Sequence, residues 1–152
     1  MRQSINRIRA KRGDEGFTLI ELLVVVVIIG VLVAIAVPVY LNYRKGAADK
    51  SAQSDVRGGV SAVEQFYTSN NNTYPDTISG TGSLTLAIAG GGTTQTITMS
   101  DKTQLGYVNN GTTYLLCANN TGGSDKWYVY NSANGGSVTA SSGTLTLATC
   151  SS

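Results

Sequence analysis

Hydrophobic residues follow three different patterns along this chain, and the first is an unbroken apolar stretch. From residue 22 to residue 41 there are twenty consecutive positions without a formal charge, and one acid, Glu21, directly precedes them. A helix of that length rises about 30 Å, which is enough to cross the hydrocarbon core of a bilayer. The stretch therefore predicts a membrane-spanning helix over residues 17–41 that carries a carboxylate near its start.

The second pattern covers residues 42–70, which are polar but keep a helical period. Apolar side chains recur there every three or four residues, at Ala48, Ala52, Val56, Val60, Val63 and Phe66/Tyr67. This spacing predicts an amphipathic helix that continues directly from the apolar segment. Gly58-Gly59 weakens the helix by about 1 kcal/mol per glycine, so a bend could form there. Asn70-Asn71-Asn72 followed by Tyr74-Pro75 ends the helix.

From about residue 83 the period changes to two, which is typical of half-buried strands. The expected strands are 83–89, 94–100, 105–109, 112–118, 126–131 and 137–150. Asn110-Gly111 indicates a hairpin between two of them. In the last segment Leu145 and Leu147 alternate with threonines. We expect an α+β fold in which an antiparallel sheet, within an outer domain of residues 71–152, packs on the amphipathic helix.

The net charge of +2 is unevenly distributed. Residues 1–16 carry five basic side chains, those of Arg2, Arg7, Arg9, Lys11 and Arg12, against Asp14 and Glu15. The rest of the chain has six basic and seven acidic residues, without the clustered cations that a nucleic-acid interface needs. The sequence therefore predicts a short basic leader and no nucleic-acid patch.

Residue types that carry catalysis or bind metals are scarce. The chain has no histidine, no G-x-S-x-G motif and no phosphate-binding loop, since Gly90-Gly91-Gly92 is not followed by G-K-[ST]. Asp76, Asp101 and Asp125 are too scattered for a calcium loop. We therefore expect no catalytic residues, no metal site and no cofactor.

Glu21 separates three interpretations of the apolar segment. A cleaved secretory signal would use Ala34-Ile35-Ala36 as its cleavage site, but such a signal has no use for an acid. An uncleaved single-span anchor also leaves Glu21 unexplained. A carboxylate at the edge of a membrane helix is costly and marks a function that involves a partner.

The third interpretation comes from the residues around Glu21. Gly16-Phe17-Thr18-Leu19-Ile20-Glu21 and the apolar run through Pro38 resemble the type III signal of type IV pilins and type II secretion pseudopilins. The resemblance implies that a prepilin peptidase cuts between Gly16 and Phe17 and then N-methylates Phe17. Glu21 occupies the position of the family's assembly glutamate, and Gly30 and Pro38 match its helix-weakening pair.

Cleavage would give Glu21 a partner. It creates an α-amine at Phe17, and stacked helices could bring a neighbour's amine against this carboxylate, which would fix the axial register between subunits. The alternative is that Glu21 reaches the headgroups alone. Pro38 loosens the helix, and the resemblance implies that residues 30–38 can unwind in a filament. An ordinary proline kink is the simpler alternative.

The resemblance also implies partners and a location. The chain would be a structural subunit of a type IV pilus, a single-pass protein of the cytoplasmic membrane that later becomes part of a surface filament. Its partners would be further copies of itself, the prepilin peptidase, an assembly platform with its ATPase, and minor pilins. Asp14-Glu15 departs from the commoner basic residue before the cleavage glycine, which leaves the type of cell envelope open. A pseudopilin of a type II secretion or DNA-uptake system is the alternative.

The outer domain carries the remaining candidate residues. Cys117 and Cys150 resemble the disulfide pair that bounds the C-terminal region of many type IV pilins, with two unpaired buried thiols as the alternative. Five aromatic residues should divide between core and surface: Tyr107, Tyr114, Trp127, Tyr128 and Tyr130. In a competing interpretation the chain is an anchored or secreted binding module, and these aromatic residues form its site, for example a sugar-binding platform.

Overall fold

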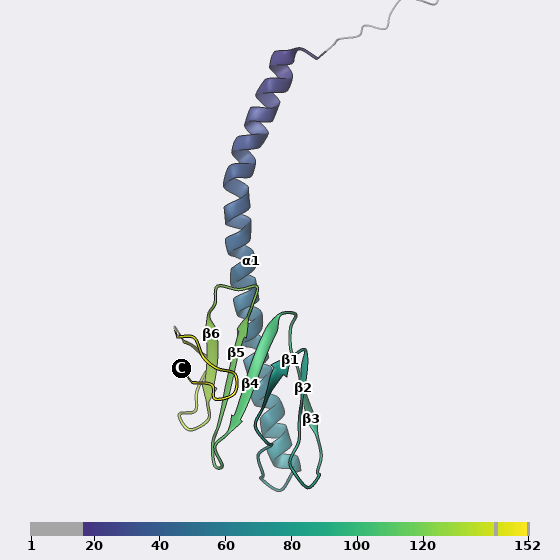
Figure 1. The fold of residues 1–152 in the computed structure, drawn as a ribbon, viewed down its shortest axis with the longest axis vertical. Coiled ribbons are helices and arrows are strands. Elements are labelled where there is room, and N and C mark those ends of the chain that lie inside the picture. The colour runs from purple at the N-terminus through teal and green to yellow at the C-terminus, as the bar shows by residue number, and fades with distance from the viewer. Residues whose placement is uncertain (1–16, 142, 152) are drawn as a thin grey trace, which may run out of the picture. The chain divides into compact units, whose positions relative to one another are not determined.

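Helix α1 (Leu19–Ser69) is the longest element of the computed structural model, which describes residues 17–141 and 143–151 (Figure 1). The chain divides into two units at Val39–Tyr40, and α1 contributes residues to both. Every described residue of the first unit is exposed to solvent. Valine and isoleucine are mediocre helix formers in water, but a helix satisfies all its own backbone hydrogen bonds, as a lipid environment requires. This stretch of α1 is long and apolar enough to cross a membrane.

In the second unit, one face of α1 packs on the sheet. Its buried apolar residues are Ala52, Val56, Val63 and Phe66, and Val60 is half-buried, so the predicted stripe is confirmed. The helix runs unbroken through Gly58-Gly59. A Cβ atom added at Gly59 would lie 3.4 Å from both terminal methyl groups of Leu116. Gly59 therefore lies on the packed side of the helix, where its small size allows close approach to the sheet.

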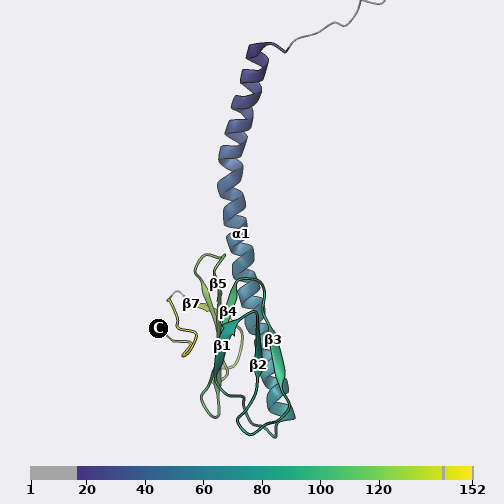
Figure 2. The same cartoon turned by 45° about the vertical axis from the view of Figure 1, so that its right-hand side comes forward.

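Seven strands follow in the described residues, and the predicted α+β class is confirmed. They are β1 (Ile78–Thr81), β2 (Ser83–Leu86), β3 (Gln95–Thr98), β4 (Thr103–Asn109), β5 (Tyr114–Asn120), β6 (Trp127–Asn131) and β7 (Thr139–Ser141). Five form an antiparallel sheet in the order β1-β4-β5-β6-β7. The other two pair as a separate β2–β3 hairpin (Figure 2). The Ile97 side chain of this hairpin would lie 3.5 Å from a Cβ atom added at Gly59 of α1.

The two faces of the five-stranded sheet have different roles. The inner face packs against α1 and carries Leu105, Tyr107, Leu116, Ala118 and Tyr128. The outer face forms a second cluster around Cys117 and Trp127, with Val108, Leu115 and Val129 partly buried beside them. Alternate residues of each strand thus supply two cores, as the strand period of two requires. The predicted Asn110-Gly111 hairpin joins β4 to β5, where Asn109 pairs with Tyr114.

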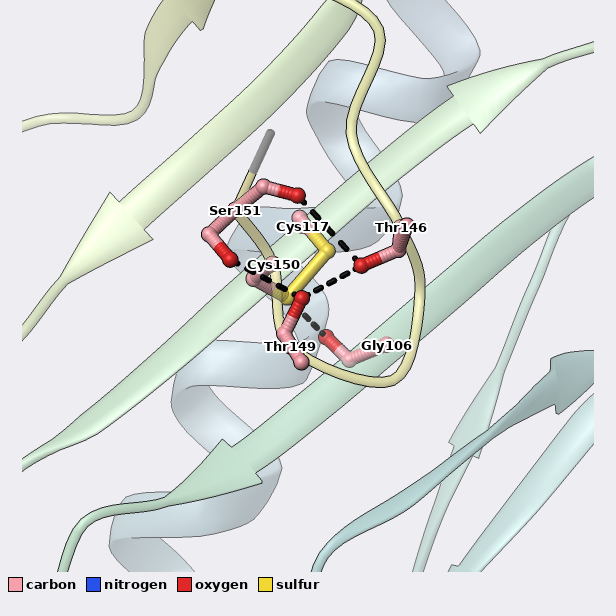
Figure 3. Close-up of a disulfide and its surroundings, with 6 residues drawn as sticks. All are labelled: Gly106, Cys117, Thr146, Thr149, Cys150 and Ser151. Atoms are coloured by element: carbon pink, nitrogen blue, oxygen red, sulfur yellow. Dashed lines mark hydrogen bonds between the residues drawn. A yellow bond between two sulfur atoms is a disulfide. The ribbon is translucent and has the colours of Figure 1, made fainter.

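The sequence interpretation was wrong about the last segment. A strand was expected over residues 137–150, but β7 ends at Ser141, and a turn closes on Thr146, whose carbonyl accepts a hydrogen bond from the Cys150 N–H at 2.8 Å. We call residues 143–151 the strap, because they cover the outer face (Figure 3). The bond to Cys117, in the middle of β5, directs the strap across the sheet instead of alongside β7. β1 was also not predicted.

Polar side chains of α1, and that of Asn70 directly after it, hold the loops between strands. The Asp49 carboxylate accepts hydrogen bonds from the backbone N–H and the hydroxyl of Ser124, and Asp55 accepts the same pair from Ser100. The Asn70 side chain pairs with the backbone of Thr93, donating to its carbonyl and accepting from its N–H, both at 2.9 Å. These contacts fix three separate loops against one helix.

Candidate functional site

The start of α1 carries the residues that the sequence marked as functional. Thr18 and Glu21 form a reciprocal cap there: the Thr18 N–H and hydroxyl donate to Glu21 Oε2 at 2.9 and 2.8 Å. In return, the Glu21 N–H donates to the Thr18 hydroxyl oxygen at 3.3 Å. This is the capping-box arrangement, in which an N-cap threonine and a glutamate three residues later satisfy each other's free backbone donors.

The cap gives Glu21 a partner within its own segment, which the sequence interpretation missed. The signal was present, because T-x-x-E before an apolar run is a capping-box pattern. Hydrogen bonds from neutral donors orient the carboxylate and lower its desolvation cost, but they do not cancel its charge. Glu21 therefore has two separable properties, a helix-capping oxygen and an unneutralised negative charge.

The surroundings of Glu21 are apolar and uncovered. Phe17 is 80% exposed, and the leucine, isoleucine and valine side chains that follow are each about half exposed or more. Continuous apolar surface of this size marks contact with a membrane or with other protein chains. Gly30 and Pro38 both lie on this exposed part of α1, and the helix continues through them. Gly16, the predicted cleavage residue, lies outside the described residues.

Residues 11–37 match the family model described as the prokaryotic N-terminal methylation motif. The match includes Gly16, Phe17, Glu21 and Gly30 and ends one residue before Pro38. The chain is 38% identical over 74 residues to the type II secretion system core protein G of Aeromonas hydrophila and 40% identical over 76 residues to that of Escherichia coli (strain K12). It is also 40% identical over 63 residues to the type IV major pilin protein PilE1 of Neisseria gonorrhoeae.

The chain is thus similar to type IV pilins and to type II secretion core G proteins over part of its length. The aligned regions cover 49%, 50% and 41% of this chain, in the same order. They span about half the length of the two core G proteins, 51% and 52%, and 38% of the gonococcal pilin. No solved structure matches the chain.

The outer domain contains a disulfide between Cys117 and Cys150, whose Cα atoms are 5.5 Å apart. Both cysteines are buried in the outer-face cluster. Gly106 is the cross-strand partner of Cys117, and the Cys150 sulfur lies 3.4 Å from the Gly106 carbonyl oxygen (Figure 3). A side chain at position 106 would collide with the backbone of Leu147. Gly106 thus lets the strap lie directly on the sheet.

The aromatic side chains do not form an exposed platform. Tyr107 and Tyr114 are completely buried, Trp127 is 7% exposed, and Tyr130 is partly buried. The Tyr114 ring lies within 6 Å, centroid to centroid, of Tyr74, Tyr107 and Tyr130. Core packing therefore accounts for most of the residues that the competing binding-module interpretation required at the surface.

Tyr114 and Tyr107 differ in how their hydroxyl groups are satisfied. The Tyr114 hydroxyl donates to Glu64 Oε1 at 2.7 Å, and burial together with this hydrogen bond raises the pKa of Tyr114. The Tyr107 hydroxyl is buried and has no hydrogen-bond partner among the described residues, and burial raises the pKa of Tyr107. Within those residues there is no group of three or more histidine, cysteine or acidic side chains that could hold a metal ion.

Proposed function

We propose that this chain is a structural, non-catalytic subunit of a type IV pilus. The observation that carries the proposal is Glu21, the one formally charged residue between positions 17 and 43, capped at the start of an exposed apolar helix within a prepilin methylation motif. Such a helix needs a membrane or other helices to cover it, and its acid needs a cation.

Processing would supply that cation. Prepilin peptidase would cut between Gly16 and Phe17 and N-methylate Phe17, leaving an amine that stays positively charged. A neighbouring subunit's amine could then pair with Glu21 in a low-dielectric filament core, where an unpaired carboxylate is expensive. The hydrogen bonds from Thr18 hold the carboxylate in place beforehand, so little ordering is lost when the pair forms.

The precursor would be a single-pass protein of the cytoplasmic membrane, and the assembled filament would lie on the cell surface. Polymerisation would require the peptidase, an assembly platform with its ATPase, and minor pilins. Gly30 and Pro38 would allow local unwinding when the helix enters the filament, because glycine and proline weaken a helix interior. A pseudopilin of a type II secretion or DNA-uptake system is the second candidate, favoured by the relatives named core protein G.

The experiment separates the charge of Glu21 from its capping role. Glu21→Gln keeps an oxygen that can accept the cap bonds but removes the charge, whereas Thr18→Val removes both hydroxyl bonds of the cap, leaves the backbone N–H bond and keeps the charge. Glu21→Ala removes both. Intact mass of each exported variant should show a methylated chain that begins at Phe17, and electron microscopy counts the filaments.

If the charge drives assembly, Glu21→Gln and Glu21→Ala should both insert and be processed, yet yield few or no filaments. Thr18→Val should assemble near the normal level. Normal filaments from Glu21→Gln would refute the ion-pair mechanism. A mature chain that begins elsewhere than Phe17 would refute the pilin assignment itself.

A further inference from the structure

Aromatic and basic side chains lie at the end of the apolar segment of α1 and directly after it. We call Tyr40, Tyr43, Arg44 and Lys45 the collar, and all four are exposed. Tyr43 is 78% exposed, and the Arg44 guanidinium carbon lies 6.0 Å from the centroid of the Tyr40 ring. Arg44 is the first charged residue after Glu21. Tyrosine, arginine and lysine are the residues that membrane proteins place at the lipid–water interface.

The next carboxylates along α1 are occupied by neutral donors. Asp49 accepts two hydrogen bonds from Ser124, and Asp55 accepts two from Ser100. Both acids thus hold loops of the outer domain. Arg44 and Lys45 remain exposed cations on the helix turns before them.

The basic residues of the second unit are distributed unevenly. Its six basic residues are Arg44, Lys45, Lys50, Arg57, Lys102 and Lys126. Four lie on α1 itself, and the other two are in the loops that Asp55 and Asp49 hold. Near the end of α1, by contrast, the charged groups are acidic: Glu64, and Asp76 in the segment that follows. The two loops also carry Asp101 and Asp125 beside Lys102 and Lys126, so the excess of cations comes from α1 itself.

We infer that the collar binds the phosphate groups of anionic phospholipids while the subunit is anchored in the membrane, an inference that rests on the proposed membrane stage of pilin function. At 1.5 Å per residue, Arg44 and Lys45 lie about 5 Å beyond Leu41, the last residue of the apolar run. The headgroup layer is about 5–8 Å thick on each side of a bilayer, so both cations fall within it. The tyrosine rings fit the same layer.

The same geometry defines a matched control on the same helix. Arg57 is exposed like Arg44, but it lies about 24 Å beyond Leu41, outside the headgroup layer. Lys50, about 13 Å beyond Leu41, also lies outside that layer. Neutralising the collar should therefore change lipid binding far more than neutralising Arg57.

The test uses the full mature chain, purified in detergent and mixed with equal amounts of phosphatidylglycerol and phosphatidylcholine. Native mass spectrometry measures the ratio of the two bound lipids for the wild type, Arg44→Gln/Lys45→Gln and Arg57→Gln. Each cation near an anionic surface favours binding about fivefold, so we expect a phosphatidylglycerol preference of at least fivefold. The double variant should lose it, and Arg57→Gln should keep it. Circular dichroism, together with a check that the Cys117–Cys150 disulfide has formed, verifies that each variant is folded.

Equal binding of both lipids by the wild type would overturn the inference. An equal loss in Arg57→Gln would also overturn it, because the preference would then reflect total charge and not the collar. Carbonate extraction of cell membranes tests the premise separately. If the precursor is released from the membranes, both the membrane stage of the proposed function and the inference about the collar are wrong. If the precursor is retained but the purified chain shows no lipid preference, only the inference about the collar is wrong.

Discussion

Replacing Gly106 by alanine should destabilise the outer domain through a collision with the strap. A Cβ atom at position 106 would lie 2.9 Å from the carbonyl carbon of Leu147 and still closer to its oxygen. Both groups are backbone, so no side-chain rotation can relieve the contact. Gly106→Ala should therefore lower the free energy of unfolding by about 1–3 kcal/mol, the usual cost of adding an atom to a filled site.

The size of the effect should depend on the Cys117–Cys150 disulfide, because that bond keeps the strap on the sheet. The bond joins residues 33 apart. Removing it by Cys117→Ala/Cys150→Ala should cost about 3–4 kcal/mol in the chain-entropy account. Without the bond the strap can lift away from Gly106, so the same alanine should then cost less than about 1 kcal/mol. The double-mutant cycle should show a coupling of roughly 1–2 kcal/mol.

Urea unfolding of the mature chain in detergent measures these free energies, with the buried Trp127 of the outer-face cluster as the fluorescent reporter. Gly58→Ala is the matched control, since no atom lies within 4 Å of an added Cβ at that exposed helix position. It should stabilise the chain by up to about 1 kcal/mol with or without the disulfide. Equal costs of Gly106→Ala in the oxidised and disulfide-free chains would refute the reasoning.

Two further predictions concern buried tyrosines. Tyr107→Phe removes a hydroxyl that has no partner among the described residues and should leave stability unchanged or higher, whereas Tyr114→Phe should cost about 1 kcal/mol by breaking its bond to Glu64. Urea unfolding compares them, and the reverse order would contradict this account. Because burial raises the pKa of both tyrosines above the unfolded value near 10, stability should hold below pH 10 and fall above it by up to about 1.4 kcal/mol per pH unit per tyrosine. Denaturation curves across that range test the slope, and a flat response above pH 10 would contradict it.

Much of the fold follows from periodicity alone. The spacing of Ala52, Val56, Val63 and Phe66 predicted which face of α1 is buried, because helical period and burial are directly linked. Alternation in the second half predicted strands, and Asn110-Gly111 predicted the β4–β5 hairpin. These features depend on neighbouring residues in the sequence, which is why they could be found there.

Features that depend on long-range contacts could not be found in the same way. Strand β1 has a single large apolar residue, Ile78, and exists because β4 pairs with it along an edge of the sheet. Leu145 and Leu147 alternate like strand residues, yet the bond to Cys117 directs their segment across the outer face. Asp49 lies on the buried side of α1, where its burial depends on hydrogen bonds from a serine 75 positions away.

The Thr18–Glu21 cap is different, because its residues are only three apart and its pattern was visible. The charge of Glu21 in an apolar segment indicates a distant cation as well, and this second signal does not depend on the cap. Local and intermolecular roles can coexist in one carboxylate. Only the exchange of glutamate for glutamine distinguishes them.

The strap also sets an order of events during folding. Cys150 follows all seven strands of the described residues, so the strap cannot cover the outer face until β4, β5 and β6 have paired. Until then Leu115, Val129 and their neighbours are open to water and to other chains. Covering of the outer face by the strap therefore follows sheet formation, and a subunit caught before that step would present an adhesive surface to its neighbours.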